Sequence, residues 1–97
     1  MPNIKIIIAD TQYLVRIGLV NLLSANKDFT ILSEAINSEE LLEMVKLHKP
    51  EVVIFDYNNP KSFVIEDISN IKKISPKTNF LVISADDNKA NIYKVIE

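Results

Sequence analysis

The stretch "EVVIFDYNNP" at residues 51–60 runs an apolar segment, Val52 to Phe55, into an aspartate and then into a short polar segment that closes on proline. The apolar residues do not alternate with polar ones, which is typical of a strand buried on both faces of a parallel sheet. Asp56 ends this strand, at the edge where open parallel α/β sheets bind their ligands. The stretch therefore predicts a buried strand that holds a functional carboxylate.

Three more apolar runs, at residues 4–9, 29–35 and 80–84, predict three further strands. The segments between and after them have helical spacing. In the first helix the residues predicted to face the sheet are Leu14, Val15, Gly18, Leu19, Leu22 and Leu23. The second helix begins at a cap, Asn37 or Ser38, and ends before Pro50. The third carries Ile65, Ile68 and Ile71, and a fourth, after Asp86 or Asp87, carries Ile92, Val95 and Ile96.

Strands and helices thus alternate along the chain, which predicts an α/β fold with a doubly wound parallel sheet. With the strand order 2-1-3-4, the first and third strands are neighbours, and Asp10 and Asp56 emerge side by side at the point where the strand order reverses. Gly18, the only glycine, is interpreted as a close-packing point between the first helix and the sheet. Because Ile17 and Val20 lie off the predicted face, the same helix is apolar nearly all round.

Length and composition limit the classes of protein to consider. The chain has 97 residues, 47% of them hydrophobic, which fits one domain, and its net charge of −2 with dispersed Lys and Arg argues against direct nucleic-acid binding by this segment. It has no cysteine, which excludes disulfides and thiolate metal sites. No apolar run is long enough for a signal sequence or a membrane span. We expect a cytoplasmic protein.

Two neighbouring carboxylates repel each other unless a proton or a cation lies between them. Mg²⁺ suits such a pair, because it prefers a few carboxylate oxygens, a carbonyl and waters, with room for a phosphate. An aspartate beside this ion can attack phosphorus and form an acyl phosphate. Ser84, at the end of the next strand, could hydrogen-bond the phosphate oxygens. The alternatives are structural: Asp56 could satisfy loop amides, Asp10 could cap the first helix, and Ser84 could cap the fourth.

Three segments, "IIIADTQYLVRIGLVNLL", "EVVIFDYNNP" and "FLVISADD", together resemble the receiver domain of two-component response regulators. The stretch "YLVRIGL" is similar to the NarL/FixJ branch, whose receivers usually precede a DNA-binding domain of the LuxR type. The resemblance covers residues 1–97 as a single receiver domain. It implies a flavodoxin-like fold, Mg²⁺ as cofactor and a sensor histidine kinase as partner.

The resemblance also implies a role for each matching residue. Asp56 is the phospho-acceptor and a metal ligand, Asp10 a second metal ligand, the backbone carbonyl of Asn58 a third, and Ser84 the switch residue that meets the phosphate. The chain would not be an enzyme with independent turnover; at most it would catalyse Mg²⁺-dependent phosphoryl transfer to its own aspartate.

The sequence departs from the family pattern at three places. Thr11 stands where the family usually has a second acid, which predicts weaker Mg²⁺ binding. Val64 stands where the loop usually has glycine, so we expect that loop to take another path. The fifth strand and helix of the family, with their lysine, are absent from residues 1–97, so we expect the strand at 80–84 to form an open edge. Either these residues are a fragment of a longer protein, or another chain completes the edge, as a homodimer or by exchange of elements.

Two functions remain open at this point. The first is a phospho-accepting receiver that controls transcription through an output domain. The second is a pseudo-receiver that cannot be phosphorylated and serves as a dimerisation or interaction module, an alternative supported by Thr11.

Overall fold

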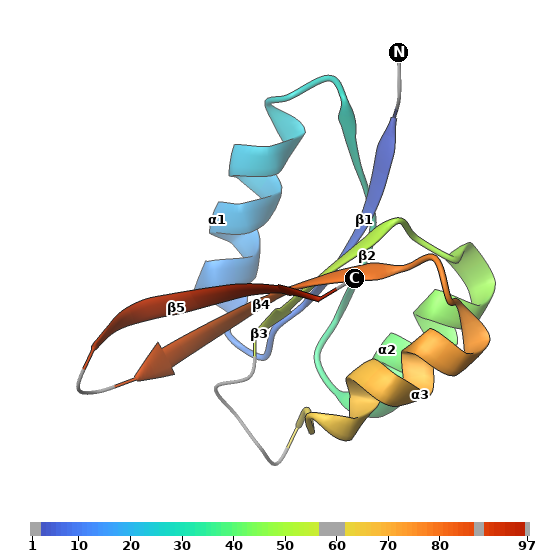
Figure 1. Ribbon diagram of the computed structural model, residues 1–97. Coiled ribbons are helices and arrows are strands. Elements are labelled where there is room, and N and C mark those ends of the chain that lie inside the picture. Colours follow the sequence, from blue (N-terminus) through green and yellow to red (C-terminus); the bar gives the residue numbers. More distant parts are fainter. Residues whose placement is uncertain (1–2, 57–61, 87–88, 97) are drawn as a thin grey trace.

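In the computed structural model, a five-stranded sheet lies between helices on its two faces (Figure 1). The structure describes the backbone of residues 3–56, 62–86 and 89–96, and the side chains of 3–55 and 62–83. The chain runs in the order β1 (Ile4–Ala9), α1 (Tyr13–Ser24), β2 (Phe29–Ala35), α2 (Ser38–His48), β3 (Val52–Asp56), α3 (Glu66–Ile74), β4 (Asn79–Asp86) and β5 (Lys89–Ile96).

The strand order is β2-β1-β3-β4-β5, and the first four strands are parallel. This confirms the predicted α/β fold and the order 2-1-3-4. The helix caps agree in part with the sequence: Asn37 caps α2, because its Oδ1 accepts a hydrogen bond from the Glu40 amide at 2.8 Å. Among the described residues, no helix is long and apolar enough to cross a bilayer.

The predicted fourth helix is wrong. Residues Lys89–Ile96 form β5, which pairs antiparallel with β4. The segment "KANIYKVI" is rich in β-branched and aromatic residues, and a short apolar run of this kind fits a strand as well as a helix. Pairing with β4 satisfies backbone groups that the parallel sheet alone would leave free. The expectation of an open edge at 80–84 is wrong for the same reason, which removes the basis for exchange of elements.

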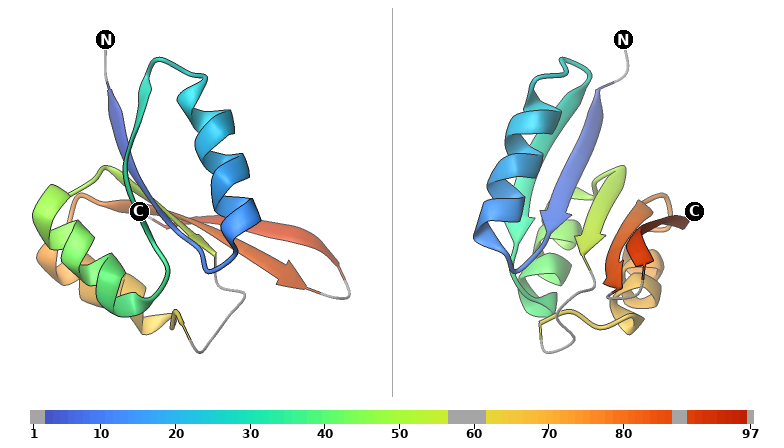
Figure 2. Two further views of the ribbon diagram at one scale, coloured as in Figure 1. Left: turned by 180° about the vertical axis from the view of Figure 1, so that it is seen from behind. Right: turned by 90° about the vertical axis from the view of Figure 1, so that its left-hand side faces the viewer.

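The two faces of the sheet are covered unequally (Figure 2). Helices α2 and α3 cover one face, where the buried core includes Leu41, Val45, Ile68 and Ile71 from the helices and Phe55 and Phe80 from the strands. Helix α1 covers part of the other face, where the strands contribute Ile6, Ile8 and Ile54 to a smaller core.

The predicted inner face of α1 is only partly right. Leu19 and Leu23 pack against the sheet, but Val20 does so too, whereas Leu14 and Leu22 are 80% and 72% exposed. Because apolar residues surround this helix, their spacing does not single out one face. Gly18 is not a close-packing point, since a Cβ added there would meet no atom within 4 Å.

Candidate functional site

The candidate site lies at the carboxyl edge of the parallel strands, which we call the carboxyl rim. Ala9 pairs with Phe55 in the β1/β3 register, so Asp10 and Asp56 follow at neighbouring strand ends. On the other side of β3, Asp56 pairs with Ile83 of β4, and Ser84 is the next residue. A register irregularity follows Ser84 in the β4/β5 pairing. The backbone thus brings Asp10, Asp56 and Ser84 to one rim from three adjacent strands.

Asp10 is the best-defined acid of the rim. It is only 1% exposed, and its backbone amide donates to the carbonyl of Ala35 at 3.0 Å. Its Oδ1 accepts a hydrogen bond from the Gln12 amide at 2.8 Å, which is the kind of contact expected of a residue that caps the turn into α1. Its Oδ2 is buried and has no hydrogen-bond partner among the described residues. One oxygen is therefore used by the fold, and the other is available to a ligand.

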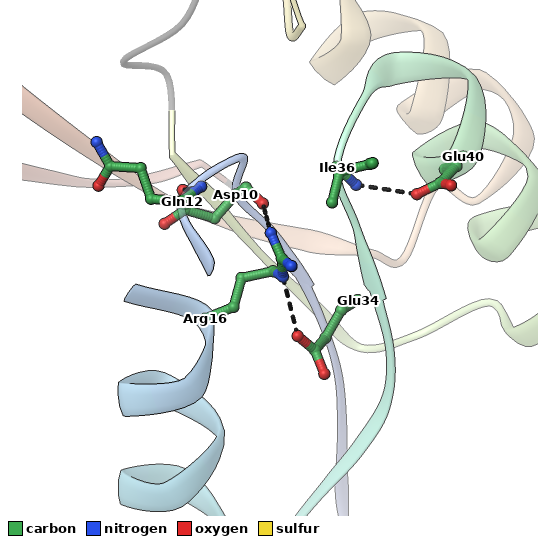
Figure 3. A network of polar contacts seen from close by, with 6 residues as sticks. All are labelled: Asp10, Gln12, Arg16, Glu34, Ile36 and Glu40. Carbon is green, nitrogen blue, oxygen red and sulfur yellow. Dashed lines mark hydrogen bonds and ion pairs between the residues drawn. The ribbon is translucent and has the colours of Figure 1, made fainter. Parts of the chain in front are cut away.

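Arg16 fixes the backbone at this position (Figure 3). Its Nη1 donates to the carbonyl oxygen of Asp10 at 2.8 Å, and its Nε donates to Oε1 of Glu34 at 3.0 Å. The guanidinium carbon also lies 5.6 Å from the centre of the Tyr13 ring, within range of a cation–π contact. Since Arg16 binds the carbonyl and not the carboxylate, it holds the turn in place and leaves Oδ2 free.

A second polar network ties the segment after β3 to α2 and α3. Asp67, in the first turn of α3, is 2% exposed, and its Oδ2 accepts from the Val64 amide at 3.0 Å. The Ser38 hydroxyl lies 2.5 Å from the same Oδ2 and 3.0 Å from the carbonyl oxygen of Ser62. The Ser38 amide also donates to Ser62 at 2.8 Å. We call these four residues the Asp67 clasp.

An aromatic contact anchors the same segment from inside. Phe63 is fully buried, and its ring centre lies 5.4 Å from that of Phe55 at an interplanar angle of 71°. Phe55 also meets Phe80 edge-to-face, with the ring centres 6.3 Å apart. Val64 does not adopt a positive φ, so the segment avoids the strain that a non-glycine residue would suffer there. The aromatic contact and the Asp67 clasp therefore hold this segment in a path that needs no glycine at position 64.

The residues present at the rim fit a cation. An unpartnered buried carboxylate oxygen is costly unless a cation or a proton meets it, and Asp10 supplies such an oxygen. Thr11, which is half-buried, adds no charge. Within the part of the chain that the structure describes, no three acidic, histidine or cysteine side chains form a ready metal cluster. The remaining predicted ligands, the Asp56 carboxylate and the Asn58 carbonyl, lie outside the described atoms.

Ser84, the predicted phosphate partner, is described only in part. The side chain of Ser84 lies outside the described atoms, although its backbone is placed in β4. Because β5 follows β4, the alternative role of Ser84 as a cap for a fourth helix no longer applies.

Reasoning from the sequence did not single out Arg16, Ser38 as a clasp residue, Phe63 or Asp67. One signal was available for Asp67: an acid in the first turn of a helix, three residues after Val64, can bind a backbone amide in front of that helix. For Phe63 the only signal of burial was its hydrophobicity, and it lies in a segment that was interpreted as a loop. The partners of Arg16 come from β2 and from the end of β1, so only the folded sheet brings them together.

The fold, the rim and the sequence identify the family. The profile of the response regulator receiver domain matches residues 6–97, and the chain belongs to this family. The chain is 28% identical over 95 residues to the probable transcriptional regulatory protein NarL of Mycobacterium tuberculosis, covering 98% of this chain and 44% of that protein. It is 32% identical over 94 residues to the transcriptional regulatory protein LnrK of Bacillus subtilis, covering 97% and 43%.

A solved structure agrees with these relatives. The signal receiver domain of the putative response regulator NarL from M. tuberculosis superposes with a TM-score of 0.80 at 28% identity, over 90% of this chain and 70% of that one. The chain spans less than half the length of the curated transcriptional regulators cited above. It is therefore a receiver domain of two-component signalling whose relatives are transcriptional regulators.

Proposed function

We propose that this receiver is phospho-accepting and of the NarL/FixJ type, with Asp56 as the acceptor and a sensor histidine kinase as the donor. The observation that carries the proposal is the buried Oδ2 of Asp10, which has no hydrogen-bond partner among the described residues and follows the strand next to the one that ends at Asp56. A cation would meet this buried carboxylate oxygen as well as a proton would, and a cation beside Asp56 is what phosphoryl transfer requires.

In the proposed step, a carboxylate oxygen of Asp56 forms a bond to phosphorus. The bond from phosphorus to the donor's imidazole nitrogen breaks, and its electron pair stays on that nitrogen. Asp10, Asp56 and the carbonyl of Asn58 would hold Mg²⁺, which supplies charge neutralisation for the transferring group. The Ser84 hydroxyl donates a hydrogen bond to a phosphoryl oxygen, and Arg16 keeps the Asp10 turn in position.

The curated relatives support transcription regulation as the output, because they are regulators of more than twice the matched length. We propose that phosphorylation shifts the population of rim conformations and so controls an output domain in the cytoplasm, with homodimerisation as the effect of the shift.

One observation favours a second candidate, a pseudo-receiver that serves only as an interaction module. Thr11 replaces an acid at the metal site, and the Oδ1 of Asp10 is already committed to the Gln12 amide. With fewer charged oxygens, the site would bind Mg²⁺ less tightly than a site with two adjacent acids.

Intact-protein mass spectrometry after incubation with acetyl phosphate and Mg²⁺ tests the two candidates. We expect the mass of one phosphoryl group to be added to the chain and not to the Asp56→Asn variant. The matched variant Thr11→Asp should lower the Mg²⁺ concentration for half-maximal modification by about tenfold, because it adds a charged ligand. An unmodified chain at high Mg²⁺, together with a Thr11→Asp variant that is modified, would favour the pseudo-receiver.

A further inference from the structure

The fold places acidic residues at one end of α2 and α3 and lysines at the other end. Helices α2 and α3 both begin at the carboxyl rim, with Glu39, Glu40, Glu66 and Asp67 in their first turns. Both end at the opposite side of the molecule, where their C-terminal ends lie side by side (Figure 1). That side collects five lysines, which we call the basic end: Lys46, Lys49, Lys72, Lys73 and Lys77.

The basic end therefore differs from the rest of the chain. It contains five of the 11 Lys and Arg residues and, counting Glu51, one of the 13 acidic residues. The rest of the chain has six basic and twelve acidic residues. Within the described residues, none of the five lysines has a carboxylate within ion-pair distance, since the ion pair found there joins Arg16 to Glu34. Lys46, Lys72 and Lys73, in the last helical turns, also offset the helix dipoles. Lys49 and Lys77 lie outside the helices.

Lys49 and Lys77 flank a cavity of about 360 Å³. Its other lining residues are Pro50, Glu51, Ile74, Ser75 and Pro76, so its walls are mainly apolar. The hydroxyls around it are already used: Thr78 donates to the carbonyl of Pro50 at 2.7 Å, and Ser75 lies 2.6 Å from the Thr78 hydroxyl. These buried bonds join the segment after α3 to the segment after α2, which both line the cavity, and a preformed apolar cavity costs little ordering when a ligand enters.

Lys49, beside the cavity, has an unusual backbone conformation. Lys49 has φ 45° in the left-handed region, and no other non-glycine residue in the described ranges has a positive φ. Helices that end in this conformation usually place glycine or asparagine there, because a Cβ is disfavoured. The chain instead has a lysine whose ammonium group adds to the charge at the cavity. A residue that costs conformational energy at a cavity is a candidate for function.

We propose that the basic end is a docking surface for an acidic segment of a partner protein, which inserts one large apolar side chain into the cavity. The carboxylates that flank this side chain would pair with Lys49 and Lys77, and the outer lysines would attract the segment over a longer range. The surface lies away from the carboxyl rim, so it is independent of the proposed phosphorylation of Asp56.

The lining favours this occupant over others with negative charge. A nucleic-acid duplex would offer phosphates to the lysines, but its bases are paired and stacked and would not enter a cavity walled by Pro50, Ile74 and Pro76. A second copy of this chain could offer its acidic rim, which makes self-association one of the outcomes to be tested. A volume near the lower end of small-ligand sites fits one side chain rather than a whole helix.

Fluorescence anisotropy with a labelled heptapeptide, three acidic residues on each side of a central tryptophan, tests the proposal. We expect saturable binding to the chain, at least about tenfold weaker when alanine replaces the tryptophan. The variants Lys49→Gly and Lys77→Gln should each weaken binding about threefold to tenfold. Glycine accepts the left-handed conformation, so Lys49→Gly removes the charge without disturbing the fold. In an NMR titration, the amides of Glu51, Ile74 and Ser75 should shift first.

The matched control is Lys27→Gln, which removes an exposed lysine just before β2 and should leave the affinity unchanged. Absence of binding to the unaltered chain would overturn the proposal. So would equal affinity for the tryptophan and alanine peptides, because charge alone would then explain binding. Tighter binding of a DNA duplex that Lys49→Gly and Lys77→Gln both weaken would assign the surface to nucleic acid. Assembly of the chain that the peptide does not reverse would assign it to a second copy.

Discussion

Under α2 and α3, the core contains fully buried residues from both helices and from four strands, together with three phenylalanine rings. Under α1, the buried residues are Ile6, Ile8 and Ile54 of the sheet, and α1 itself has no buried residue. Helix α1 is longer and more apolar than α2 or α3, so the composition of the helices does not explain why its face is the less buried one. What differs is enclosure: two adjacent helices shield each other's inner residues, whereas a single helix leaves its flanks in water.

The difference implies that stability resides mainly on the face under α2 and α3. Replacing the same residue type, leucine by alanine, on each face measures this directly, because the deleted atoms are identical and only the surroundings change.

The largest effect is expected for Leu41→Ala in α2. Leu41 is fully buried, so the deletion leaves a cavity that its neighbours cannot fill. We expect the free energy of unfolding to fall by about 3 kcal/mol. Urea denaturation followed by circular dichroism measures it, and a loss below about 1 kcal/mol would contradict the assignment of the main core to this face.

A smaller loss is expected for Asp67→Ala. The variant leaves the part-buried Val64 amide and Ser38 hydroxyl without their shared acceptor, which should cost about 2 kcal/mol. Asp67→Asn keeps one acceptor oxygen and should cost about half as much. Thermal unfolding of the two variants side by side gives the ranking. If alanine were tolerated better than asparagine, the clasp would not stabilise the segment.

The smallest effect is expected on the other face. Leu19→Ala removes a half-buried side chain of α1 and should cost about 1 kcal/mol. Its control, Leu22→Ala on the same helix, removes a side chain that is 72% exposed and should change stability by about 0.5 kcal/mol or less. A loss at Leu22 as large as that at Leu19 would show that something covers the outer side of α1 in solution.

The parallel part of the fold could be predicted from the sequence because its signals are local. Continuous apolar runs marked β1 to β4, and Asn37 and Pro50 marked the ends of α2. The side of α1 that faces the sheet could not be predicted, because apolar residues surround the helix and only packing selects Leu19, Val20 and Leu23.

The secondary structure at the end of the chain could not be predicted from local sequence either. The segment at 89–96 has apolar residues at spacings compatible with either a helix or a strand, and pairing with β4, a tertiary effect, decides the matter. At the carboxyl rim, the strand ends of Asp10 and Asp56 followed from the strand order. The contacts of Arg16 with Glu34 and of Asp67 with Ser38 could not be anticipated, because these partners are distant in sequence and meet only in the folded chain.

Within the described residues, the acids at the beginning of α2 and α3 and the lysines at their ends give this part of the molecule an electric dipole. A charged protein that approaches within a Debye length, about 8 Å at physiological ionic strength, would turn this 40 Å molecule before contact, so that one end meets it preferentially. A phosphoryl group on Asp56 would carry roughly −1.5 to −2 charges but would replace the −1 of the free carboxylate, so the end that is already negative would gain roughly −0.5 to −1. Phosphorylation would therefore strengthen the orienting torque as well as alter the rim.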